Sequence, residues 1–445
     1  MRRQPIYIGV CCAVLLASAA QAQTPTPTPA QTETQPAPPQ GPRLTLKDAE
    51  QRALAGHPGI LAAQAAAQAA EENVSETRAA YFPALFGNVT GAAAPANTRI
   101  TAGALNNPSI FDRFALGVTA SQLVTDFGRT SDLVQSQKLR AGAQAQNVTL
   151  LRADVLLDVD RAYFDALRAQ AVLRVAQETV DARQLVVDQV TAQANSGLKS
   201  GLDVSFARVN LSQAQLLRVQ ADGDVQAAFA ALSTAMGEAQ TSTYELVDEP
   251  VTSPPSDAAS AIIAQALRDR PDVAAQRLQA EAASKFADAE RALLRPTVAA
   301  VGAAGVTPYR DSALAEHYSA AGFNVTVPVF TGGLYSARRS EAVFRAQVAD
   351  QARRDLENRV ARDVTQAFVQ VRTGFQRVDL SNQLLVQATD ALDLAQQRYS
   401  LGLSSIVELT QAQLNKTEAE ISVATARYDY QARLAALRFQ AGALK

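Results

Sequence analysis

Apolar residues recur at steps of three and four along residues 129–196, the spacing of a helix that packs into a coiled coil. This stretch lies between Gly128 and Gly197 and contains no proline and one glycine, Gly142. At about 1.5 Å per residue, an uninterrupted helix of this length would run about 100 Å. The repeating positions are Val148, Leu151, Val155, Val159, Ala162, Ala166, Ala169, Leu173, Ala176 and Val180. Many are alanine, so the pattern predicts a long helix that lets its neighbours approach closely.

The same plan occurs a second time at residues 334–401, between Gly333 and Gly402. Landmarks outside the long helices repeat as well, as when Pro83 of the first half corresponds to Pro296 of the second. These matches stay in register over the whole length and indicate an internal duplication. Each half is expected to contain two helices, a strand pair, a very long helix, a tight turn and a return helix.

The boundaries expected from these landmarks divide the chain into six parts. They are a signal peptide at 1–22, a Pro/Thr-rich linker at 23–43, a first repeat at 44–237, a linker at 238–256, a second repeat at 257–442 and a tail at 443–445. Within the repeats we expect strand pairs at about 84–121 and 297–327, long helices at 129–196 and 334–401, and return helices at 202–236 and 406–441.

The strand segments alternate between two kinds of face. Phe114, Leu116 and Val118 fall on one face of residues 114–121, with small or polar residues between them, and residues 319–327 alternate in the same way. Such strands are typical of transmembrane barrels, which start at about eight strands. Four strands per chain would leave open edges in lipid, whereas three copies would supply twelve. The pattern predicts a homotrimer, with a soluble helical protein carrying small hairpins as the alternative.

Composition narrows the compartment and the class of protein. A charged start, an apolar run at residues 6–16 and a small-residue cleavage motif at 20–22 have the order of a secretory signal. Cys11 and Cys12 are the only cysteines and fall inside it. The net charge of −2 offers no basic surface for nucleic acid. No other apolar segment reaches about 18 residues, so any membrane segment is expected as strands. No catalytic, metal or cofactor constellation is present in the sequence, and the chain is not expected to be an enzyme.

Six short segments carry a family likeness. They are Tyr81-Phe82-Pro83, residues 124–129 (VTDFGR), residues 196–198 (SGL), Arg270-Pro271-Asp272, residues 327–333 (VPVFTGG) and residues 399–403 (YSLGL). Each is short, but they occur in order and the turns occur twice. Together they resemble the TolC-like outer-membrane efflux family, the outer membrane factors of tripartite efflux and type I secretion systems. The resemblance covers about residues 43–445.

The resemblance implies a mainly α-helical fold with a transmembrane β-barrel. In that family a homotrimer builds a 12-stranded barrel, a helical coiled-coil tunnel through the periplasm and a small mixed α/β equatorial region. The implied function is a passive exit duct in outer-membrane lipid, docked by a periplasmic adaptor protein and an inner-membrane pump of the RND, ABC or MFS type, with no cofactor. A periplasmic coiled-coil structural or adaptor protein without a barrel is the alternative. Drugs, metal ions and polypeptides all stay open as cargo.

The resemblance also places a periplasmic gate beside the second turn. The family has carboxylates at two positions one helical turn apart, which here are Glu408 and Gln411. Some members close the gate with an arginine and a tyrosine; Tyr399 fits, whereas Ser404 stands at the arginine position. Asp203 is the first-half equivalent of Glu408 and is expected to accept a hydrogen bond from Tyr399. Three copies of Glu408 would favour cations at a constriction; the alternative is that both acids are solvated residues of a first helical turn.

Gly197, Leu198, Gly402 and Leu403 form the two turns and are the candidates for adaptor docking. Glycine allows the chain to reverse tightly, and the leucines would be exposed apolar side chains at the free end of the helices. The alternative is that all four residues serve only to form the turns.

Overall fold

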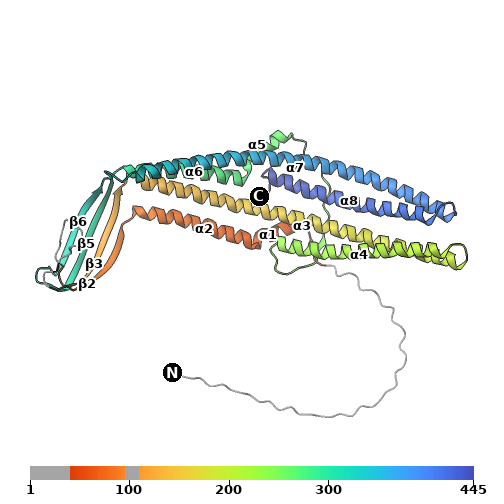
Figure 1. The fold of residues 1–445 in the computed structure, drawn as a ribbon, viewed down its shortest axis with the longest axis horizontal. Coiled ribbons are helices and arrows are strands. Elements are labelled where there is room, and N and C mark those ends of the chain that lie inside the picture. The colour runs from red at the N-terminus through yellow and green to blue at the C-terminus, as the bar shows by residue number, and fades with distance from the viewer. Residues whose placement is uncertain (1–40, 96–97, 99–109, 445) are drawn as a thin grey trace, which may run out of the picture. The chain divides into compact units, whose positions relative to one another are not determined.

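The computed structural model describes residues 41–95, 98 and 110–444 (Figure 1). Its helices are α1 (Leu46–Gly56), α2 (Pro58–Arg78), α3 (Arg129–Asn195), α4 (Gly201–Ala235), α5 (Ala259–Asp269), α6 (Pro271–Arg291), α7 (Leu334–Ser400) and α8 (Ile406–Gln440). Its strands are β1 (Arg43–Leu44), β2 (Ala84–Ala92), β3 (Arg113–Thr125), β4 (Glu245–Leu246), β5 (Thr297–Arg310) and β6 (His317–Thr326). The signal peptide predicted at 1–22 and most of the linker predicted at 23–43 lie outside the described residues.

The two halves repeat one order of elements. α2, β2, β3, α3 and α4 in the first half correspond to α6, β5, β6, α7 and α8 in the second. The long helices α3 and α7 each contain 67 residues, and both begin after a left-handed glycine, Gly128 with φ 101° and Gly333 with φ 84°. None of the apolar positions predicted to line the first long helix is exposed. The steps of three and four are therefore confirmed as a packing pattern.

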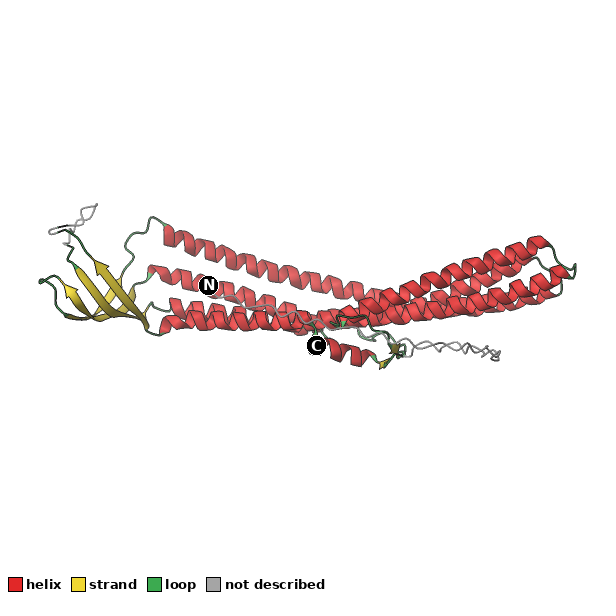
Figure 2. Cartoon of the chain, turned by 90° about the horizontal axis from the view of Figure 1, so that it is seen from below, coloured by secondary structure: helices red, strands yellow, loops and turns green. Residues whose placement is uncertain are grey.

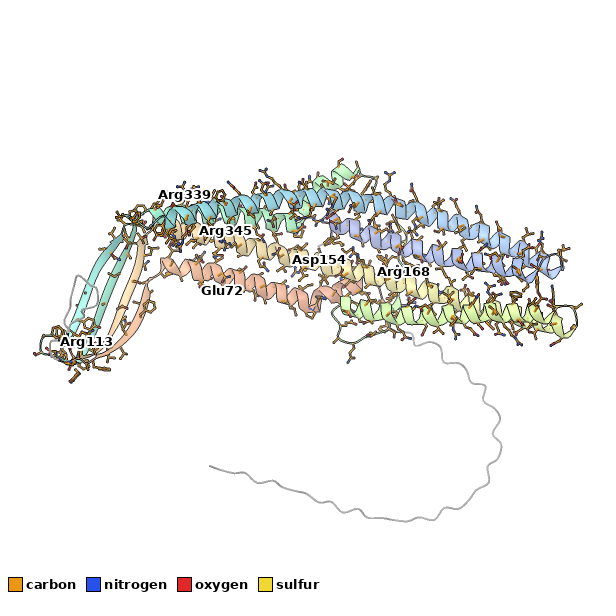
Figure 3. All side chains as sticks on the ribbon, viewed as in Figure 1. Glu72, Arg113, Asp154, Arg168, Arg339 and Arg345 are labelled. Carbon is orange, nitrogen blue, oxygen red and sulfur yellow. The ribbon has the colours of Figure 1, made fainter. Side chains whose placement is uncertain are left out.

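α3 is the helix on which most others pack. It contacts α2, α4, α6 and α8, while α7 contacts α6 and α8. The shorter helices lie end to end along the long ones, α2 and α4 beside α3, and α6 and α8 beside α7 (Figure 1). Arg168, labelled in Figure 3, joins α3 to α8 through an ion pair of 3.1 Å with Asp429. None of the helices in the described residues has the apolar stretch that a bilayer crossing requires.

β2, β3, β5 and β6 form one antiparallel sheet in that order. The register sets Leu116 opposite Val89 and Val306, so apolar side chains collect on one face. The exposed apolar side chains of this face are Leu85, Val89, Phe114, Leu116, Val118, Val306, Phe323 and Val325. The other face is mostly small or polar, and there Asn88 donates to Thr119 Oγ1 at 3.0 Å. It also exposes three large side chains, Phe86, Val301 and Tyr318. Among the described strands, β2 and β6 are paired on one side only, so the sheet is open.

A small mixed α/β region lies beside the middle of α3. β1 pairs in parallel with β4, and α1 packs on α3. Tyr163 is fully buried, and its hydroxyl lies 2.9 Å from the carbonyl oxygen of Leu44 and 2.7 Å from that of Val247. Part of the sequence prediction is wrong here, because β4 and Arg43 were both assigned to linkers. A two-residue strand forms only because a distant strand pairs with it, so no local sequence pattern predicts it.

The same region buries a carboxyl group that takes part in no ion pair in the described structure. Asp160 on α3 is 2% exposed and faces Glu50 of α1 and Arg438 of α8. Burial first, and then the negative charge of Glu50, raise the pKa of the Asp160 carboxyl to about 8, although Arg438 acts against the shift. Burial beside a second carboxyl group therefore favours the protonated form of Asp160 in the folded protein.

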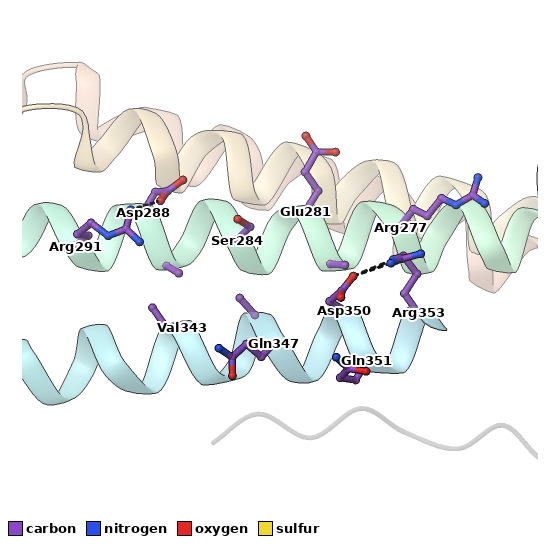
Figure 4. A pocket seen from close by; sticks show the side chains of 13 residues that line it. Arg277, Glu281, Ser284, Asp288, Arg291, Val343, Gln347, Asp350, Gln351 and Arg353 are labelled. Carbon is purple, nitrogen blue, oxygen red and sulfur yellow. Dashed lines mark hydrogen bonds and ion pairs between the residues drawn. The ribbon is translucent and has the colours of Figure 1, made fainter. Parts of the chain in front are cut away.

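A groove of about 680 Å³ runs between α6 and α7 (Figure 4). Charged side chains along it pair with one another: Arg353 donates to Asp350 at 2.8 Å, and Arg291 donates to Asp288 at 3.1 Å. These two pairs match four of the groove's charges within its own walls, and Arg277 pairs with Glu357 outside the groove lining.

Candidate functional site

Both helical hairpins end in turns of the same design, at the end of the helices away from the sheet (Figure 2). Gly197 has φ 76° and Gly402 has φ 72°, the left-handed conformation that commonly closes a helix. The N–H groups of Leu198 and Leu403 each donate to a carbonyl in the last turn of the preceding helix, at 2.9 and 2.8 Å. Leu198 is 75% exposed and Leu403 is 68% exposed. The residues predicted for docking thus occupy two tight turns that present leucine to solvent.

A small apolar cluster beneath the turns holds the two hairpins together. Its buried members are Val190, Leu392, Ala395, Ile406, Leu409 and Ala412, with Val186, Val204 and Tyr399 packed against them. These residues come from α3, α4, α7 and α8. Packing of all four helices places the predicted gate residues of both halves in one neighbourhood.

Asp203 does not bond to Tyr399, and the prediction of that hydrogen bond is wrong. Its carboxylate instead accepts from Ser200, from the backbone N–H at 3.0 Å and the hydroxyl at 2.9 Å. Ser200 accepts in return from the Asp203 N–H, which completes a capping box at the start of α4. The Ser200 backbone and side-chain hydrogen bonds lower the pKa of Asp203. The local cap satisfies this carboxylate before the distant tyrosine can compete for it.

Tyr399 is half-buried between the hairpins, and its hydroxyl has no hydrogen-bond partner in the described structure. Burial, and then the nearby negative charge of Asp203, raise the pKa of Tyr399. The Lys199 ammonium of the first turn lies 4.2 Å from the centre of the Tyr399 ring, close enough for a cation–π contact. Ser404 is also half-buried, with its hydroxyl unpaired. The contact between the two turns is therefore made by lysine and the tyrosine ring.

Glu408 forms an ion pair with Arg398, at 3.1 Å between Oε1 and Nε. Both side chains are about half exposed, 44% for Glu408 and 48% for Arg398. Gln411 lies one turn further along α8 and donates to Asn415 of the same helix at 2.9 Å. Of the two positions predicted to hold a carboxylate, only position 408 does so, because position 411 is glutamine. The Arg398 guanidinium balances the negative charge of Glu408.

Sequence reasoning missed Arg398. It lies in the last turn of α7, whereas Glu408 lies in the first turn of α8. The tight turn at Gly402 lays these two helical turns side by side. A signal for the pair was present, because a basic residue ending one helix and an acid starting the next are both favoured by the helix dipoles. No cluster of potential metal ligands occurs among the described residues.

A profile of the outer membrane efflux protein family matches residues 49–238 and 262–443, most of both repeats. The chain belongs to this family. The assignment places it in the outer membrane as an efflux component, and favours that function over a periplasmic adaptor without a membrane part.

Individual relatives agree with the family match. Protein CyaE of Bordetella pertussis is 26% identical over 396 residues, covering 85% of this chain and 80% of the relative. Outer membrane protein TolC of Escherichia coli is 22% identical over 402 residues, covering 85% of this chain and 78% of the relative. The outer membrane channel CmeC of Campylobacter jejuni shares the fold, with a TM-score of 0.78 and 16% identity over 89% of this chain and 85% of that one.

Proposed function

We propose that this member of the outer membrane efflux protein family works as a homotrimeric exit duct whose strands form one 12-stranded barrel. The observation that carries the proposal is the open four-stranded sheet with one exposed apolar face. In lipid, unpaired N–H and C=O groups along β2 and β6 would each cost several kcal/mol. Joining β2 of one copy to β6 of the next would satisfy both edges and turn the apolar face outward to lipid.

The helices provide a second reason for association. α4 packs on α3 and only marginally on α8, and its outer side carries a stripe of exposed apolar residues. The stripe consists of Leu202, Phe206, Val209, Leu216 and Val219, spaced at three, four and seven residues. α7 exposes a comparable set, Leu380, Leu384 and Leu394, and Leu401 at its C-cap is exposed as well. Stripes of this spacing fit into a neighbouring helix, so α4 of one copy is proposed to pack on α7 of the next.

In this arrangement the duct performs no chemistry, and an inner-membrane pump supplies the energy. The tip would form the periplasmic gate, with Glu408, Gln411, Tyr399, Ser404 and Asp203 around its opening. Leu198 and Leu403, held outward by Gly197 and Gly402, would contact a periplasmic adaptor. The exposure of both leucine side chains supports this role, since an apolar side chain in solvent on a reverse turn does not stabilise the fold of the isolated chain.

The experiment changes Leu198 and Leu403 together to aspartate in the full-length protein and measures export from cells. We expect export to be lost while the protein still runs as a trimer that resists mild heating. Leu61→Asp, at an exposed leucine of α2, is the matched control and should leave export intact. Normal export by the double variant would remove the leucines as contacts. A wild-type protein that is monomeric in its own membrane would overturn the duct itself.

A further inference from the structure

Arg183 is a buried cation that forms no ion pair in the described part of the chain. It lies on α3, about four helical turns before Gly197, and is only 6% exposed. Its Nη1 atom has no hydrogen-bond partner, and no ion pair within 4.0 Å involves this residue among the residues that the structure describes. Burial lowers the pKa of the guanidinium, although an arginine stays charged in proteins. An isolated buried charge is strongly unfavourable unless an opposite charge joins it.

The guanidinium borders a cavity of about 190 Å³ between α3, α4 and α8. Besides Arg183, its polar lining consists of Thr179, Asn210, Gln213, Thr410 and Thr417. No carboxylate lines this cavity. By the volume that a water molecule occupies in the liquid, about 30 Å³, the space admits a few water molecules or one small ion with its hydration.

Some of the lining groups are free to donate hydrogen bonds into the cavity. The hydroxyl groups of Thr179 and Thr417 donate to backbone carbonyls of their own helices and have no further proton to donate. Thr410 differs, because its Oγ1 accepts from Asn210 at 3.1 Å and so keeps its own proton to offer. With the guanidinium of Arg183 and the amide of Gln213, this hydroxyl makes a donor set without a competing acceptor charge.

Two acids, Glu178 and Glu420, line an adjoining cavity of about 70 Å³ that Arg183 also borders. Glu420 already pairs with Lys416 at 2.8 Å. Glu178 is exposed on the surface of α3. Neither forms an ion pair with Arg183, so the protein's own carboxylates leave its charge unmatched.

We propose that Arg183, Thr410 and Gln213 bind a small inorganic anion, of the class of chloride or phosphate, in this cavity. The anion supplies the missing negative charge. It also ties the two hairpins together, because its ligands come from α3 and α4 of the first hairpin and α8 of the second. The site lies deeper in the bundle than the tip residues and does not depend on their proposed roles.

The test follows thermal unfolding of the full-length protein in detergent, with sodium gluconate replaced stepwise by sodium chloride or sodium phosphate at constant ionic strength. A ligand that binds only the folded state lowers the unfolding equilibrium constant about elevenfold when present at ten times its Kd. We therefore expect the midpoint temperature to rise with chloride or phosphate, and the stronger of the two responses identifies the preferred anion.

Variants distinguish this site from general salt effects. Arg183→Gln should abolish the response, and in gluconate alone it should unfold at a higher temperature than the wild type, since it removes an unmatched buried charge. Arg208→Gln makes the same charge change at an exposed position of α4 and should respond like the wild type. Thr410→Val, which keeps every charge, should weaken the response. An equal response in Arg183→Gln, or none in the wild type, overturns the proposal.

Discussion

Replacing Glu408 with glutamine tests how the tip controls ions. In the structure this carboxylate is matched by Arg398 at 3.1 Å, so the pair carries no net charge. Glu408→Gln leaves the guanidinium alone, and three copies in a trimer would then place a charge of about +3 around the opening. Arg398→Gln does the opposite and leaves about −3. The ion pair thus predicts that the two glutamine variants shift the ion selectivity in opposite directions. A ring of carboxylates without the arginines would not predict this pair of results.

The size of the shift follows from Coulomb's law. For an ion about 10 Å from each charge in water, the energy is about 0.4 kcal/mol per charge. At 0.1 M salt the Debye length is about 10 Å and reduces this to about 0.15 kcal/mol. Three charges together change the local concentration of cations and of anions about twofold in opposite directions, or about fivefold in their ratio. At 0.01 M salt, with a Debye length of about 30 Å, the ratio changes about twentyfold.

The assay is the reversal potential of single channels in planar bilayers under a potassium chloride gradient. Glu408→Gln should shift the potential toward anion selectivity and Arg398→Gln toward cation selectivity, each more strongly at low salt. The double variant restores a neutral ring and should behave like the wild type. If both single variants leave the potential unchanged, or shift it in the same direction, Glu408 and Arg398 do not face the conduction path.

Two further predictions concern the mixed α/β region. Above pH about 4 an unfolded chain releases the proton that folded Asp160 keeps until its pKa of about 8, so the free energy of unfolding should fall as pH rises between these values, by at most about 1.4 kcal/mol per unit. Asp160→Asn should flatten that slope in thermal unfolding measured from pH 5 to pH 8; an unchanged slope refutes the assignment. Tyr163→Phe removes the one hydroxyl proton that the carbonyl oxygens of Leu44 and Val247 share, and leaves the buried Leu44 carbonyl without this donor. It should cost about 1–3 kcal/mol in denaturant unfolding, whereas Tyr81→Phe, at an exposed tyrosine, should cost little.

The long helices and their turns could be predicted from the sequence because the information is local. Apolar steps of three and four, the absence of proline, and glycines at the ends describe α3 and α7 to within one residue. Gly197 and Gly402 could be placed for the same reason, since a left-handed residue closes a helix wherever the helix stops. Strand alternation is local as well, and it already separated the apolar face of the sheet from the polar one.

The tip shows where local reasoning ends. Asp203 was assigned to Tyr399, but its own capping box holds it. Arg398 was overlooked, although it is the residue that neutralises Glu408. Both outcomes depend on which side chains meet when two helical hairpins pack, and several partners within reach are compatible with the same sequence pattern.

The sequence by itself determined the duplication, the four strands, the two long helices and the position of the turns, because each is set by periodicity or by the backbone preferences of a few adjacent residues. Only the tertiary structure decided that β1 pairs with β4, that Asp160 is buried and that Arg183 lies buried without a counter-charge. The physical reason is that burial and pairing are properties of contacts between distant segments. A charged residue on a helix reads the same in sequence whether the fold leaves it in water or encloses it between three helices.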